Sequence, residues 1–146
     1  MQKGIVTPEE INNFNEDGVV CIRSVLSSEW LELLDKGTKQ AQKNPSPFSK
    51  SYGPEGAPRY YTDHGLFNRF EAFNKFLFKG PLPRIAAEIL GSKRVDLYDE
   101  HLLIKEPGAP APTYWHHDLP YFSIEGKQIL SIWFALDSTR ATTGAL

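Results

Sequence analysis

The sequence predicts an α+β fold in which residues 1–91 are mainly helical and residues 92–146 form strands. In the first part, apolar residues recur at spacings of three and four, as in 82–90, which is the period of a helix. After residue 92, apolar residues alternate with polar ones or run continuously between turns rich in proline and glycine, which is typical of strands. The chain has 146 residues, of which 40% are apolar, so it is long enough to form the core of a single domain.

Helices in the first part are predicted from their apolar period and from their end signals. Thr7 precedes Pro8 and is followed three residues later by Glu10, which is a capping box at a helix start. Prolines at 45, 47, 54 and 58 predict a long loop there. The helices are expected at 8–17, 28–43, 67–76 and 82–90, with short strands at 19–22 and 59–62.

Three strands are expected in the second part, at 95–105, 113–122 and 128–136. A proline-rich run at 107–112 connects the first two. In the third strand, successive side chains should point to opposite faces. One face would then carry Leu130, Ile132, Phe134 and Leu136, and the other Ile129, Ser131, Trp133 and Ala135.

Charge and composition exclude several classes of partner. The net charge of −2 gives no basic field for a phosphate backbone, so we expect no nucleic-acid partner. No apolar stretch reaches the length of a signal peptide or a membrane span, so we expect no membrane association and a cytoplasmic location. Cys21 is the single cysteine and is expected to be a small core residue.

The segment 113–122 carries the densest group of chemically active side chains. If it is extended, His116 and Asp118 lie on one face and His117 on the other. A His-x-Asp pair supplies two ligands of the two-histidine, one-carboxylate triad that holds non-haem Fe(II). The alternative is a polar strand that faces solvent. The other two histidines, His64 and His101, are expected to be turn or core residues.

Several segments together resemble the phytanoyl-CoA dioxygenase family. They are 101–108, which ends in Lys-Glu-Pro-Gly, 115–121, which reads Trp-His-His-Asp-Leu-Pro-Tyr, and 131–133, followed by Asp137 and 144–146. The resemblance implies an N-terminal helical part followed by the first strands of a double-stranded β-helix, a cupin-like jelly roll. It also implies an Fe(II)- and 2-oxoglutarate-dependent dioxygenase that uses O2 to hydroxylate an aliphatic small-molecule or acyl substrate.

Carried over position by position, the resemblance makes His116 and Asp118 the iron ligands. It places Trp133 beside the 2-oxoglutarate co-substrate, with Leu102 lining the same pocket. His117 stands where the family commonly has glutamine, and its expected position on the opposite strand face gives it no role as a ligand. Lys105 could attract a carboxylate or lie in solvent at the end of a strand.

The family pattern continues beyond Asp118 to a second iron-binding histidine and to an arginine for 2-oxoglutarate. No histidine follows Asp118 in this sequence. We therefore expect 1–146 to be one partial oxygenase domain that matches the N-terminal half of the family pattern. Whether this chain alone is an enzyme stays open at this point, the alternative being an inactive, truncated form.

Overall fold

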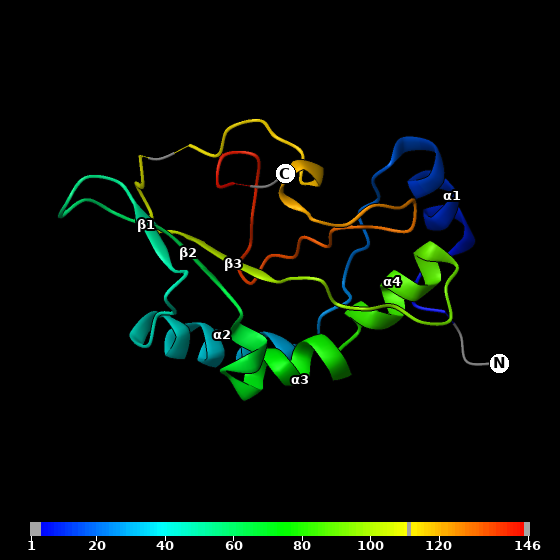
Figure 1. The fold of residues 1–146 in the computed structure, drawn as a ribbon, viewed down its shortest axis with the longest axis horizontal. Helices are drawn as coiled ribbons and strands as arrows, with labels where there is room; N and C mark the ends of the chain where they lie inside the picture. Colours follow the sequence, from blue (N-terminus) through cyan, green and yellow to red (C-terminus); the bar gives the residue numbers. More distant parts are fainter. Residues whose placement is uncertain (1–3, 111, 145–146) are drawn as a thin grey trace.

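The computed structural model describes residues 4–110 and 112–144, and it confirms the predicted α+β class. Within these residues, two helices are followed by two strands, two further helices and a third strand, and the three strands form one antiparallel sheet (Figure 1). The helices are α1 (Pro8–Asp17), α2 (Ser28–Lys43), α3 (Glu71–Lys79) and α4 (Leu82–Leu90). The strands are β1 (Lys50–Tyr52), β2 (Tyr60–His64) and β3 (His101–Lys105), and 3-10 turns cover Leu66–Asn68 and Leu119–Tyr121.

The start of α1 and the end of α4 form as the local sequence predicts, whereas the helix expected at 67–76 is wrong in its bounds, because a 3-10 turn covers Leu66–Asn68 and α3 begins at Glu71. The Thr7 hydroxyl accepts a hydrogen bond of 3.2 Å from the backbone N–H of Glu10, and the Glu10 carboxylate accepts one of 2.7 Å from the backbone N–H of Thr7. This reciprocal pair satisfies donors that the first turn of a helix leaves free. At the end of α4, Gly91 adopts a left-handed conformation with φ of 60°.

The sheet has the order β1-β2-β3, and its two faces have different surroundings. On one face, Tyr61 pairs with Ile104 and Asp63 with Leu102, and three of these four residues are buried. On the other face, His64 pairs with His101 and Tyr60 with Lys105. In Figure 1, α2 and α3 lie along one side of the sheet and the segment that follows β3 passes on the other.

The hydrophobic core joins the helices to the sheet and to the C-terminal segment. Leu34, Leu66 and Phe76 are fully buried. The Phe76 ring lies 5.5 Å from the Trp30 ring and 5.1 Å from the Phe134 ring, measured between centroids. The residues expected on one face of 128–136 pack against this core, namely Leu130, Ile132, Phe134 and Leu136. The C-terminal segment is therefore anchored on α3.

Several predicted strands are wrong. The segments 19–22, 113–122 and 128–136 form no strand. Of the strand predicted at 95–105, only β3 (His101–Lys105) pairs with another strand. A strand needs a partner chain for its backbone groups, and the prolines at 107, 110, 112 and 120 remove backbone donors that a ladder would use. Conversely, β1 forms inside the predicted loop because β2 offers it a partner.

The expectation for Cys21 is wrong, and a few residues of the predicted segments lie outside the described part of the chain. Cys21 is exposed, so it is not the core residue that was predicted. Ala111, Ala145 and Leu146, which belong to the proline-rich run and to the segment 144–146, lie outside the described residues.

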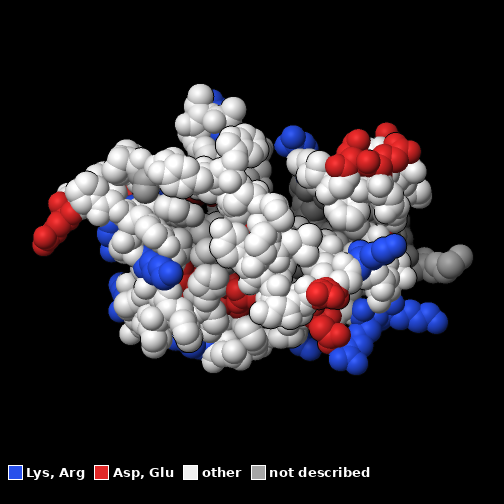
Figure 2. Space-filling model, turned by 45° about the horizontal axis from the view of Figure 1, so that its top comes forward, with Lys and Arg blue, Asp and Glu red and all other residues white. Residues whose placement is uncertain are grey.

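The surface charges are scattered rather than gathered into one basic patch on the face that Figure 2 shows. Acidic side chains gather over α1, which contains Glu9, Glu10, Glu16 and Asp17. On α2, Lys39 donates a hydrogen bond of 2.6 Å to Asp35, one turn earlier. None of the helices in the described ranges is both long and apolar enough to cross a membrane.

Candidate metal site

The segment that carries the two histidines turns instead of running straight. Asp118 has φ of −74° and ψ of −29°, which is a helical conformation, and a 3-10 turn follows at Leu119–Tyr121 with proline near its start. Alternation of side chains across a strand therefore does not apply here. His116 and Asp118 are brought together by the turn and not by strand parity.

The His116 ring is oriented by a backbone carbonyl. Its Nδ1 lies 2.7 Å from the carbonyl oxygen of Tyr114. A carbonyl can only accept, so Nδ1 carries the proton, and in the neutral ring Nε2 carries the lone pair. This Nε2 lies 3.7 Å from Oδ1 of Asp118. The Tyr121 ring stands edge-on to the imidazole with 6.2 Å between centroids.

The Asp118 carboxylate is held by the hydroxyl of Ser131. The hydroxyl of Ser131 donates a hydrogen bond of 2.7 Å to Oδ2 of Asp118. The other oxygen, Oδ1, faces the imidazole. Both side chains are about half exposed, so an ion could reach them from solvent.

The His116 and Asp118 pair offers two donor atoms of the kinds that bind a divalent metal ion. Ligand atoms that each lie about 2.1 Å from one ion, at right angles, are about 3 Å apart. The observed 3.7 Å is therefore within 1 Å of this separation. A neutral imidazole nitrogen and a carboxylate oxygen are the kinds of atom that such a site requires, and each group is oriented by a hydrogen bond at its other polar atom. In the described part of the chain, no group of three histidine, cysteine, aspartate or glutamate side chains could hold a metal.

The other two histidines lie on β2 and β3 and contact each other. The rings of His64 and His101 are stacked with centroids 3.8 Å apart, and Nδ1 of His64 lies 3.0 Å from Asp99. Burial, and then the charge of His64, lowers the pKa of His101 to about 4, although the charges of Asp99 and then of Asp118 act in the opposite direction.

The remaining predicted site residues lie in different surroundings. Trp133 is 45% exposed, on the face of its segment opposite the core contacts of Ile132 and Phe134. Leu102 is buried in the core, on the face of the sheet where it pairs with Asp63. On the opposite face, Nζ of Lys105 lies 4.9 Å from the centre of the Tyr60 ring.

A hollow of about 380 Å³ adjoins Asp118. His117 lines it together with Asp118, whereas His116 is not among its lining residues, so the expectation that His117 points away from the metal pair stays a prediction. Ser131, which was expected only on one face of the strand at 128–136, also lines it. The remaining lining residues are Leu119, Phe122, Gly126, Lys127, Ile129 and Leu130.

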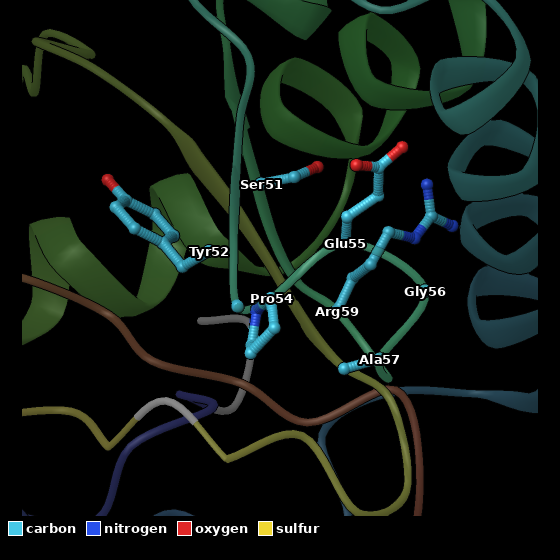
Figure 3. Close-up of a pocket in the computed structure, with 8 residues that line it drawn as sticks. Ser51, Tyr52, Pro54, Glu55, Gly56, Ala57 and Arg59 are labelled. Carbon is cyan, nitrogen blue, oxygen red and sulfur yellow. The ribbon is translucent and has the colours of Figure 1, made fainter.

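A second hollow, of about 350 Å³, lies within the turn that joins β1 to β2. Figure 3 shows Ser51, Glu55 and Arg59 on one side of this turn and Tyr52 on the other. Arg59 is already engaged, because its guanidinium donates to Glu106 at 2.9 and 3.1 Å. None of the predicted site residues lines this hollow.

Comparison with protein families adds one finding. The family model described as "Phytanoyl-CoA dioxygenase (PhyH)" matches residues 14–146. The match covers the His116 and Asp118 segment, β3 and Ser131. Searches of curated proteins and of solved structures found no match.

Proposed function

Because the chain belongs to the phytanoyl-CoA dioxygenase family, we propose that it is an Fe(II)- and 2-oxoglutarate-dependent dioxygenase that hydroxylates an aliphatic small-molecule or acyl substrate. The family has a dioxygenase-type function and depends on Fe(II) and 2-oxoglutarate, with O2 and a small molecule as its reactants. The observation that carries the proposal for this chain is the pair of His116 Nε2 and Asp118 Oδ1, 3.7 Å apart.

The proposed roles follow from what each side chain offers. His116 would contribute a neutral nitrogen whose direction is set by the Tyr114 carbonyl. Asp118 would contribute the single negative charge, which leaves a bound divalent ion positive enough to attract an oxo-acid. Trp133, half exposed, would stand beside that oxo-acid. Fe(II), when bound, supplies the O2 chemistry that amino-acid side chains lack.

The substrate is proposed to occupy the hollow beside Asp118. Its volume of about 380 Å³ lies in the range of small-molecule sites. Apolar side chains of Leu119, Phe122 and Ile129 are among its walls, which favours an aliphatic group. We also propose that the antiparallel sheet belongs to a double-stranded β-helix, with the site on the face that carries His101 and Lys105.

A second candidate function is that this chain alone binds a metal ion but does not catalyse the reaction. The observation that favours it is the site itself, which has two protein ligands in the described residues instead of three. Fewer ligands fix the geometry of a metal less well. Turnover separates the two candidates.

Succinate release by the full chain tests the proposal. With Fe(II), ascorbate, 2-oxoglutarate and O2, we expect iron-dependent release of succinate. Asp118→Asn should lower this release by more than about 100-fold, which exceeds the loss usual for a residue that only hydrogen-bonds to a metal ligand. Asp17→Asn, an exposed aspartate on α1, is the matched control and should leave release unchanged. Iron binding without release of succinate would favour the second candidate, a chain that binds metal but is inactive. Equal release in Asp118→Asn would exclude Asp118 as a ligand.

A further inference from the structure

The Ser131 hydroxyl is the only side chain from another segment that the structure bonds to the Asp118 carboxylate within the described residues. The bond spans 13 positions in the sequence and is 2.7 Å long. It is a hydrogen bond to a charged acceptor, which is stronger than one between neutral groups. Ser131 therefore links the turn at Asp118 to the C-terminal segment.

The position of Ser131 is itself fixed by its neighbours. Leu130 and Ile132, on either side of it, pack against the hydrophobic core. Two positions further on, Phe134 contacts the Phe76 ring of α3 at 5.1 Å. Ser131 lies between these anchors and is exposed, and its hydroxyl reaches Oδ2 of Asp118.

This hydrogen bond gives the two oxygens of the Asp118 carboxylate different surroundings. Oδ2 accepts from Ser131, whereas Oδ1 faces His116 Nε2 at 3.7 Å. On the other ligand, the Tyr114 carbonyl occupies Nδ1 and leaves Nε2 free. Each ligand therefore has one atom held by the protein and one atom directed to the common point between them.

We infer that Ser131 is a positioning residue, which directs Oδ1 of Asp118 toward the metal that His116 and Asp118 share. The inference rests on the proposed function, because it needs a metal at this pair. Without the hydroxyl, the half-exposed carboxylate is free to rotate, and the metal must fix it at the cost of affinity.

The test is a Co²⁺ titration of the full chain by calorimetry, with the visible absorption of the bound ion recorded in parallel. Ser131→Ala should weaken binding by about 10- to 100-fold and change the absorption bands, since this is the usual effect of losing an outer partner. Ser131→Thr, which keeps the hydroxyl, should restore both. Ser138→Ala, at an exposed serine nearby, is the matched control and should bind as the wild type does.

Each result either supports the inference or overturns it. The midpoint of urea unfolding without metal should be the same for Ser131→Ala and wild type, because a positioning role leaves the fold intact. If Ser131→Ala binds Co²⁺ like wild type while His116→Ala does not bind, Ser131 has no such role and the proposed site stands. If wild type and His116→Ala bind equally, the proposed site fails and the inference fails with it. A lowered urea midpoint that accounts for the weaker binding, without rescue by threonine, would assign Ser131 a structural role only.

Discussion

Replacing Asp63 with alanine is expected to lower the free energy of unfolding by about 3–5 kcal/mol, the usual effect of breaking a buried charge network. Asp63 is completely buried on the helix side of β2. Its carboxylate accepts hydrogen bonds from the Ser46 N–H at 3.1 Å, the Tyr61 hydroxyl at 2.9 Å and the His64 N–H at 2.8 Å. The Ser46 hydroxyl also donates to it, and Arg69 lies 3.6 Å away.

The alanine would leave these donors without an acceptor in the interior, and each unpaired donor costs about 1–3 kcal/mol. Urea unfolding of the purified chain measures the effect. Asp17→Ala, at an exposed position of α1, is the matched control and should change stability by less than about 0.5 kcal/mol. A loss below about 1 kcal/mol for Asp63→Ala would contradict a central role of this carboxylate.

The same residue gives the stability a defined dependence on pH. Burial acts to raise the pKa of Asp63, but the hydrogen bonds from Ser46, His64 and Tyr61 outweigh it and hold the pKa below the ordinary value of 3.8. The folded chain therefore prefers the carboxylate form. Its contribution is complete above about pH 4 and is lost as the pH falls through the lower pKa of the folded state. Asp63→Asn should weaken this loss in acid-unfolding curves.

The second large effect is expected at the metal pair. His116→Ala should reduce the affinity for Co²⁺ by more than about 100-fold, because it removes the nitrogen ligand and not merely an outer partner. His117→Ala is the matched control, since His117 is the adjacent histidine and it is His116 that lies 3.7 Å from Asp118 Oδ1. It should change the affinity by less than about threefold. A larger loss for His117→Ala than for His116→Ala would reverse the assignment of the ligand.

The parts of the fold that depend on near neighbours could be predicted from the sequence. The capping box of Thr7 and Glu10 involves residues three positions apart, and its bonds form as expected. The apolar face of 128–136 was also correct, because burial of Ile132 and Phe134 requires only the right spacing and not a ladder. Strands require distant partners, and for this reason β1 was missed and the strand at 113–122 was wrongly expected.

The sequence predicted that His116 and Asp118 pair, but not the backbone conformation that brings them together. Pairing of His116 with Asp118 was expected from strand parity, and the structure produces it through a turn at Asp118. The partner of Asp118, Ser131, is distant in the sequence, so only its place on the polar face of 128–136 pointed to it.

Resonances of the imidazole nitrogens provide the most direct test of the metal pair. The chain has four histidines, and long-range ¹H–¹⁵N spectra of the full chain with and without Zn²⁺ would separate their ring nitrogens. A site at His116 and Asp118 predicts that Zn²⁺ shifts the Nε2 signal of His116, while its Nδ1 keeps the proton that it donates to Tyr114. Shifts confined to the stacked pair of His64 and His101, or no shift at His116, would contradict it.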